Sequence, residues 1–315
     1  MTSDFDKPVR VTKDVSATFR IAGHILGAAI VELQATTARI VFSGDLGRPS
    51  DPIMYPPVRI PQADFLLLES TYGNRRHGER DAQDALADII NRTAKRGGTV
   101  LIPSFAVGRA QTLLYHIHQL KAAARIPDIP VYLDSPMAID ASELFCKHAS
   151  GHKLSKDQCR AACRVATYVH DSEKSKALDH DPMPKIIIAA SGMATGGRVL
   201  HHLKFYAPDA RNTVLFAGFQ AGGTRGAAMV AGADRIKIHG EYHDVRAEIA
   251  NLHMLSAHAD ADEIMDWLGG FESPPKQTFI VHGEPDAADA LRHRIEEELG
   301  WSVVVPEQVE TWNLD

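Results

Sequence analysis

Five short segments place a histidine or a carboxylate beside glycine or just ahead of a predicted helix. They are Gly23-His24-Ile25-Leu26-Gly27, Ser43-Gly44-Asp45-Leu46-Gly47, Leu68-Glu69-Ser70-Thr71-Tyr72-Gly73, Ser256-Ala257-His258-Ala259-Asp260 and Val281-His282-Gly283-Glu284. Strand ends can aim side chains into a shared site, and glycine lets backbone or substrate approach closely. Imidazole and carboxylate together are the usual zinc ligands of hydrolytic sites. Each segment alone is compatible with a structural histidine or a turn, so the ordered set carries the prediction.

Strands and helices that position these segments follow from the hydrophobic pattern. In the first 70 residues we expect strands at 17–21, 28–33, 38–42 and 64–69, whose short connections favour an antiparallel or mixed sheet. From about residue 80, apolar strands alternate with helices, which indicates a parallel sheet covered on both faces. Its strands are expected at 99–102, 129–134, 185–191, 212–218 and 235–240, and its helices before 97, at 108–125 and at 196–205. Strands at 249–255, 278–282 and 302–305 and helices at 260–268 and 286–299 complete the pattern.

Length and composition bound the class of protein. The chain has 315 residues, of which 44% are hydrophobic and 23% charged, enough for one large or two modest domains and too apolar for a disordered chain. No run of 18 apolar residues occurs and the N-terminus lacks a basic or apolar leader, so we expect a cytoplasmic protein with no membrane partner. The net charge is −6, so a nucleic acid would have to meet a local basic lining.

The three cysteines are expected to be reduced. Their number is odd and no CxxC pair occurs, which argues against a disulfide framework. Cys159 and Cys163, with His148 and His152 nearby, could imitate a metal cluster. Buried thiols on a helix are the commoner outcome, and we expect that outcome here.

Longer segments in a fixed order extend the pattern over essentially the whole chain. They are Pro103-Ser104-Phe105-Ala106-Val107-Gly108-Arg109-Ala110-Gln111, Tyr132-Leu133-Asp134-Ser135-Pro136-Met137-Ala138, Ala190-Ser191-Gly192-Met193-Ala194-Thr195-Gly196-Gly197-Arg198 and Gly218-Phe219-Gln220-Ala221-Gly222-Gly223-Thr224-Arg225-Gly226. Together with the first five, they make the sequence resemble the β-CASP branch of the metallo-β-lactamase superfamily. That family consists of RNA-processing nucleases, including the cleavage and polyadenylation nuclease subunit and its bacterial relatives.

The resemblance implies a role for each residue of the five segments. His24 resembles the third-motif zinc ligand, Asp45 the carboxylate that bridges two zinc ions, and His282 the last ligand of the second zinc. Glu69 resembles the family's first extra motif, and His258 resembles the histidine of RNA-directed members. A histidine oriented by a carboxylate can protonate a leaving oxygen near neutral pH. We therefore expect His258 to be the acid and Glu69 its orienter; the alternative is a histidine that caps a helix.

The sequence departs from the family in its metal ligands. Members carry an upstream aspartate and an HxHxDH loop that supply further ligands, and neither motif occurs in this sequence. The only HxH, at His116-Ile117-His118, falls in a predicted helix. Three ligands cannot fill two zinc sites, so we expect an incomplete metallo-β-lactamase domain and impaired hydrolysis. A start codon placed too far downstream is one explanation.

RNA contacts are expected at glycine-bearing loops that follow parallel strands. Arg109, Arg198 and Arg225 lie in such loops and could clamp phosphates, with the amides of Gly196 and Gly197 assisting at a helix N-terminus. Surface salt bridging is the alternative for each arginine.

The expected architecture is α/β, a partial metallo-β-lactamase αββα domain with an inserted β-CASP domain on a parallel sheet. Residues 1–73 are expected to form the second part of the metallo-β-lactamase domain, 74–256 the β-CASP domain, and 257–315 the return with the RNA-specificity motif. The implied activity is zinc-dependent RNA hydrolysis, endonucleolytic or 5′-exonucleolytic. The alternative is a non-catalytic RNA-binding or scaffold subunit. The expected partners are RNA and either a second copy of this chain, as a homodimer, or a protein that supplies the missing metallo-β-lactamase half.

Overall fold

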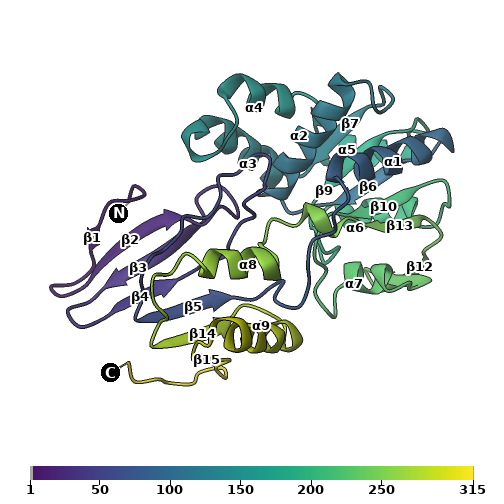
Figure 1. Ribbon diagram of the computed structural model, residues 1–315. Helices are drawn as coiled ribbons and strands as arrows, with labels where there is room; N and C mark the ends of the chain where they lie inside the picture. Colours follow the sequence, from purple (N-terminus) through teal and green to yellow (C-terminus); the bar gives the residue numbers. More distant parts are fainter. Residues whose placement is uncertain (1–2, 315) are drawn as a thin grey trace. The chain divides into compact units, whose positions relative to one another are not determined.

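The computed structural model describes residues 3–314 and divides the chain into two compact units (Figure 1). Unit 1 comprises Met1–His77 and Ala257–Asp315, and unit 2 comprises Gly78–Ser256. Met1, Thr2 and Asp315 lie outside the described residues. The assignment of named domains to residues 1–73, 74–256 and 257–315 stays a prediction. Within 3–314, no helix is long and apolar enough to cross a membrane.

Unit 1 is built on a seven-stranded mixed sheet in the order β1-β2-β3-β4-β5-β14-β15. Its strands are β1 (Val9–Arg10), β2 (Ser16–Ile21), β3 (Ala29–Gln34), β4 (Arg39–Phe42), β5 (Phe65–Glu69), β14 (Gln277–Val281) and β15 (Val303–Val304), and its helices are α8 (Ala261–Leu268) and α9 (Pro285–Leu299). The first four strands pair antiparallel and the last four parallel. The expected mixed sheet is therefore confirmed.

Pairing of β5 with β14 joins the two ends of the chain in unit 1. The register runs from Phe65 opposite Gln277 to Glu69 opposite Val281, so Glu69 and His282 come to the same edge of the sheet. Buried apolar residues of both strands, Leu66, Leu68 and Ile280, pack in one core with residues of α8 and α9. This packing fixes the strand ends that carry the site.

Unit 2 is built on a six-stranded sheet, order β13-β10-β6-β9-β7-β8, in which every neighbouring pair is parallel. Its strands are β6 (Val100–Pro103), β7 (Val131–Asp134), β8 (Thr167–Tyr168), β9 (Ile186–Ala189), β10 (Thr213–Phe216) and β13 (Glu248–Asn251). Its helices are α1 (Ala82–Lys95), α2 (Arg109–Ala122), α3 (Pro136–Lys147), α4 (Lys156–Cys163), α5 (Ser172–His180), α6 (Val199–Tyr206) and α7 (Arg225–Val230), with 3₁₀ turns at Ala149–Gly151 and His253–Leu255. A hairpin of β11 (Arg235–Ile238) and β12 (Glu241–Asp244) forms a separate small sheet.

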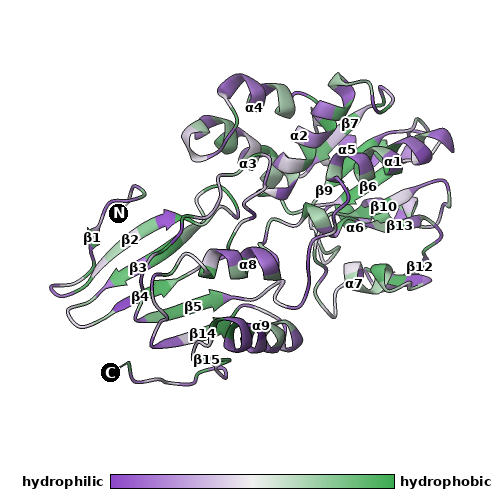
Figure 2. Cartoon of the chain, in the orientation of Figure 1, coloured by the Kyte–Doolittle hydropathy of each residue, from purple (hydrophilic) through white to green (hydrophobic). Residues whose placement is uncertain are grey.

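Both faces of the parallel sheet are buried. Val100 and Ile102 of β6 point into one core with α1 and α2, whereas Leu101 points into a second core with α6 and α7. The alternation repeats in β9 and β10, so these central strands are apolar at nearly every position, as Figure 2 shows by their green colour. The expected doubly covered parallel sheet is confirmed. The placement of the strand at 235–240 in that sheet is wrong, because β11 pairs antiparallel with β12 in the separate hairpin.

Several elements lie where the sequence predicted none: α3, α5, α7, β1, β8 and β12. Helix α5 buries only Ser175 and Leu178, so it carries almost no hydrophobic periodicity. The strand expected at 249–255 ends at Asn251, and a 3₁₀ turn at His253–Leu255 replaces its second half.

The expectation of three reduced thiols is wrong. Cys146 of α3 and Cys159 of α4 form a disulfide, with their Cα atoms 5.6 Å apart. An odd count leaves one cysteine over but does not tell whether two others meet in space. Packing of α3 against α4 decides that, and Cys163 is the cysteine left outside the bond.

Candidate metal centre

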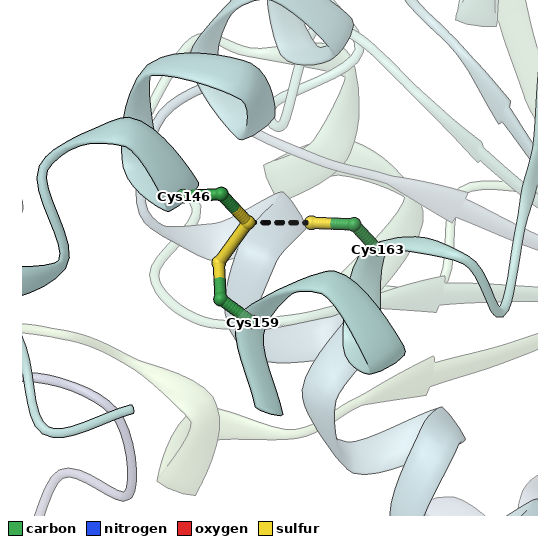
Figure 3. Close-up of side chains that lie close together, drawn as sticks. All are labelled: Cys146, Cys159 and Cys163. Carbon is green, nitrogen blue, oxygen red and sulfur yellow. Dashed lines mark hydrogen bonds between the residues drawn. A yellow bond between two sulfur atoms is a disulfide. The ribbon is translucent and has the colours of Figure 1, made fainter. Parts of the chain in front are cut away.

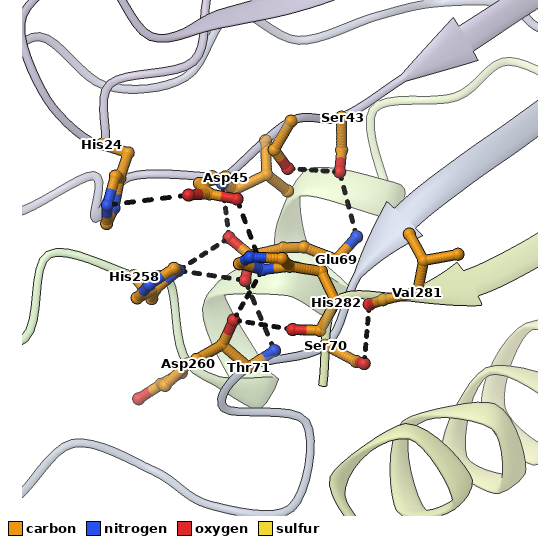
Figure 4. Close-up of polar contacts among 12 residues, drawn as sticks. His24, Ser43, Asp45, Glu69, Ser70, Thr71, His258, Asp260, Val281 and His282 are labelled. Carbon is orange, nitrogen blue, oxygen red and sulfur yellow. Dashed lines mark hydrogen bonds and ion pairs between the residues drawn. The ribbon is translucent and has the colours of Figure 1, made fainter. Parts of the chain in front are cut away.

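His24 and Asp45 meet because two loops touch at glycine. Gly23 has φ +79°, and Gly47 approaches it so closely that a Cβ on Gly47 would lie 2.1 Å from the Gly23 carbonyl carbon and oxygen. No other residue type fits this contact. The contact sets His24 Nε2 3.8 Å from Asp45 Oδ2 (Figure 4).

His282 reaches the same carboxylate from the end of β14. Its φ of +60° is left-handed, an unfavourable conformation for this residue type that is commonest at functional sites. His282 Nδ1 lies 3.4 Å from Asp45 Oδ1, and Thr71 Oγ1 donates a 3.1 Å hydrogen bond to the His282 carbonyl. Asp45 therefore turns one oxygen toward His24 and the other toward His282.

His258 is held by Glu69. Its Nδ1 lies 3.1 and 3.2 Å from the two carboxylate oxygens of Glu69, which is fully buried at the end of β5. The backbone N–H of Leu46 donates to the same carboxylate. Burial alone would raise the pKa of Glu69, but the hydrogen bond and charge of His258 outweigh it and lower that pKa. Glu69 is therefore ionised and fixes the orientation of the His258 ring.

A second cluster, missed in the sequence, supports the His258 loop. His77 Nε2 lies 2.9 Å from the His258 carbonyl oxygen, and the His77 backbone N–H donates to Asp260. Asp260 also caps α8 in a reciprocal capping box with Glu263. The Asp-x-x-Glu spacing was a readable signal for the cap, whereas nothing in the sequence pointed to His77.

The donor set fits a borderline cation such as zinc. Ligand atoms of His24, Asp45 and His258 all lie within 4.8 Å of one another, and His282 faces the other oxygen of Asp45. Imidazole and carboxylate are ordinary zinc ligands, and a carboxylate with one oxygen toward each side suits a bridging role. The structure thus brings together His24, Asp45, Glu69, His258 and His282. The role of each stays a prediction.

Two of the arginines expected to bind RNA form hydrogen bonds within unit 2, and one of them also forms an ion pair. Arg198 Nη1 makes a 2.5 Å ion pair with the buried Asp134, and both terminal nitrogens donate to the carbonyls of Val169 and His170. Arg225 donates to the carbonyls of Lys237, Ala194 and Thr195. The hydrogen-bond partners of Arg225 are thus backbone carbonyl oxygens, which do not neutralise its charge. The carboxylate of Asp134, by contrast, neutralises the charge of Arg198.

The other residues expected to contact RNA are also partly buried or already hydrogen-bonded within the protein. Arg109, the first residue of α2, is only 9% exposed. The Gly196 N–H lies 3.2 Å from Ser191 Oγ and donates to it. Gly197 has φ +77°, and a Cβ there would lie 2.3 Å from the Ala190 carbonyl oxygen. The expected helix begins at Val199, three residues later than predicted. An RNA-binding role for these residues stays a prediction.

Asp134 also organises a buried histidine that gives unit 2 a pH dependence. His202 Nε2 lies 2.7 Å from Asp134 and Nδ1 2.6 Å from Asp179. Burial opposes protonation, but these two bonds outweigh it and raise the pKa of His202 to about 8. Because this folded pKa exceeds the unfolded value, the stabilisation is complete below about pH 6.5 and is lost as pH rises through 8.

We therefore expect the free energy of unfolding to fall by about 2 kcal/mol between pH 6 and pH 9. Urea unfolding of the full chain at several pH values measures this fall. His202→Asn should flatten the curve, and the exposed His293→Ala serves as the matched control. An unchanged slope in the His202 variant would contradict the assignment.

Comparison with known proteins adds family evidence to this geometry. A Beta-Casp domain model matches residues 110–229, and a model of the Zn-dependent metallo-hydrolase RNA specificity domain matches residues 238–306, which include His258 and His282. Ribonuclease TTHA0252 of Thermus thermophilus is 39% identical over 286 residues, covering 88% of this chain and 64% of the relative.

Two archaeal proteins are also similar. Transcription termination factor FttA of Thermococcus kodakarensis is 31% identical, over 100% of this chain and 51% of its own length. The RNase J-like protein of Methanocaldococcus jannaschii is 29% identical, over 87% of this chain and 65% of its own length. The chain thus spans between half and two thirds of the length of these three relatives. With both domain models in the expected order on an α/β fold, the chain belongs to the β-CASP family of metallo-β-lactamase-fold RNA-processing nucleases.

Proposed function

We propose that this chain provides part of the active site of a zinc-dependent RNA hydrolase, acting as an endoribonuclease, a 5′-exoribonuclease or both. One observation carries the proposal: Asp45 stands between His24 and His282, and His258 beside them is oriented by the buried Glu69. The model matched at residues 238–306, whose description names zinc dependence and RNA specificity, supports the same metal and substrate.

In the proposed mechanism, His24, Asp45 and His282 would hold the metal. Bound zinc would supply Lewis-acid activation of water and neutralise charge at the phosphate. The chain's own acid is His258, whose protonated ring gives a proton to the leaving oxygen. Glu69, ionised and buried, keeps Nδ1 of that ring protonated and leaves the opposite nitrogen for proton transfer. His77 and Asp260 position the loop that carries His258.

The test measures RNA and DNA cleavage with and without added Zn²⁺. It uses the 315-residue chain, alone and joined to a segment that carries an HxHxDH loop. We expect zinc-dependent cleavage of RNA by the joined form. Asp45→Asn should abolish both the cleavage and the zinc bound at this site, since it removes the shared ligand, whereas the exposed Asp128→Asn should change neither. Cleavage that survives in the Asp45 variant would refute the proposed site.

A non-catalytic RNA-binding or scaffold subunit is the second candidate. The incomplete ligand set favours it, because the sequence contains no HxHxDH loop. RNA binding without cleavage, in the joined form as well, would establish this reading. We also propose a cytoplasmic location, which cell fractionation tests. We further propose either a homodimer or a partner subunit that supplies the missing ligands, and cross-linking during purification from cell extract distinguishes these two.

Arg225 is the arginine that we expect to contact RNA. Its hydrogen bonds go to backbone carbonyls, so its charge is available to a phosphate, unlike that of Arg198. Arg225→Gln should lower the slope of log binding constant against log salt by about 0.7 for single-stranded RNA. Arg211→Gln removes the same charge from an exposed pair with Asp209 and should leave the slope unchanged. Equal slopes for Arg225→Gln and the unaltered chain would assign Arg225 to structure alone.

A further inference from the structure

Three sulfur atoms of unit 2 lie close together outside the proposed active site (Figure 3). Cys146 comes from α3, and Cys159 and Cys163 lie one turn apart on α4, so both face the same partner helix. Beyond the Cys146–Cys159 disulfide, the Cys163 thiol donates a hydrogen bond to Cys146 Sγ at 3.6 Å. All three sulfur atoms lie within 4.8 Å of one another.

A structural crosslink does not explain this arrangement. A disulfide needs only two cysteines, yet the sulfur of Cys163 lies within 3.6 Å of Cys146 Sγ, close enough to share one cation with it. Thiolates are the preferred ligands of soft d¹⁰ cations, and three converging sulfurs suit Cu⁺ or, with one further ligand, Zn²⁺.

The surroundings of the three sulfur atoms suit a negatively charged metal centre that solvent can reach. A cavity of about 320 Å³ is lined by Cys146 and Cys163 and by the exposed Arg160 and Arg164, with Glu143 at the same wall. Three thiolates around Zn²⁺ or Cu⁺ carry net negative charge, and the two guanidinium groups would offset it. The cavity also gives a fourth ligand, such as water or a small thiol, access to the cation.

His152 is excluded as that fourth ligand. Its Nε2 hydrogen-bonds to the Phe145 carbonyl at 2.9 Å, its Nδ1 accepts from the Leu154 N–H, and its ring stacks on Phe145 at 3.9 Å. Burial lowers its pKa. The histidine is thus a buried structural residue, and the sulfurs alone define the site.

We propose that Cys146, Cys159 and Cys163 form a redox-gated site for a soft d¹⁰ cation, bound by the three thiolates and released when the disulfide closes. Reduction transfers two electrons and two protons from a dithiol to the Cys146–Cys159 bond, leaving two protein thiols and the oxidised dithiol. Cation binding then displaces the three thiol protons. Oxidation by a disulfide reverses the first step and removes two ligands at once.

The test titrates metal into the full chain after reduction with dithiothreitol and its anaerobic removal. Co²⁺, as a probe for Zn²⁺, gives thiolate-to-metal charge-transfer absorption that histidine and carboxylate ligands do not produce. Cu⁺ is titrated against a chromophoric chelator. We expect the reduced chain to bind one cation in at least one of the two titrations, and the Co²⁺ titration to show the charge-transfer band. The oxidised chain should bind no metal through thiolates.

Variants separate binding from folding. Cys163→Ser keeps the Cys146–Cys159 disulfide, so its oxidised form should unfold as the unaltered chain does, yet its reduced form should bind at least tenfold more weakly. Asp45→Asn alters the proposed active site and should leave the charge-transfer band unchanged, which distinguishes failure here from failure there. No thiolate-bound metal in either arm, or equal affinity in Cys163→Ser, would overturn the proposal.

Discussion

Supplying the missing ligands is expected to raise RNA cleavage by this chain by several orders of magnitude. The described residues offer His24, Asp45 and His282, with His258 beside them, for two metal ions. Hydrolytic zinc sites usually need three protein ligands each, and water is a poor nucleophile without bound zinc, which lowers the pKa of that water.

The measurement compares zinc content and RNA cleavage for the 315-residue chain and for a form joined to an HxHxDH segment. The short chain should hold less than one zinc in this centre, and the joined form two. Because the cysteine cluster could also bind zinc, both forms carry Cys163→Ser and are compared in the oxidised state. Full cleavage and two zinc ions in the short chain would show that other residues supply ligands.

The central strands and the first helix of unit 2 were readable from the sequence, whereas most of its other elements were not. Strands β6, β9 and β10 are buried on both faces, so their apolar runs are continuous and bounded by turns. Helix α1 shows the amphipathic period and an Asp81 cap, and it was expected. By contrast, α5 is held by two buried residues and by Ser175 Oγ donating to the buried Asp134, a contact that leaves no periodic signal.

The residues of the site were identified by motif, but their convergence was not readable from spacing. It depends on the β5–β14 pairing, which places Glu69 opposite Val281, and on the contact between Gly23 and Gly47. Both are non-local, and hydrophobic periodicity describes only local structure. His77 could not be predicted from the sequence either, because its contact with the His258 carbonyl also joins distant segments.

The number and spacing of the cysteines did not predict their redox state correctly. An odd count in a chain without CxxC favoured reduced thiols, and α3 was not expected at all. Once α3 packs against α4, Cys146 lies opposite two cysteines one turn apart, and the disulfide follows.

His258→Ala in the joined form is expected to lower kcat for RNA cleavage by about 10²–10⁴-fold, the usual contribution of a general acid. The ring is held at Nδ1 by the buried Glu69, so loss of the imidazole removes the proton donor while the carboxylate remains in place. His293→Ala, on the exposed face of α9, is the matched control and should leave kcat unchanged.

Zinc content decides between an acid and a ligand role for His258, because its ligand atoms also lie within 4.8 Å of those of His24 and Asp45. If His258 is the acid, the variant keeps its zinc and loses rate. Glu69→Gln should then also keep its zinc and lower kcat, since an amide cannot hold the ring as the two carboxylate oxygens do. Loss of zinc from His258→Ala would make His258 a metal ligand and leave the leaving oxygen without an acid from this chain.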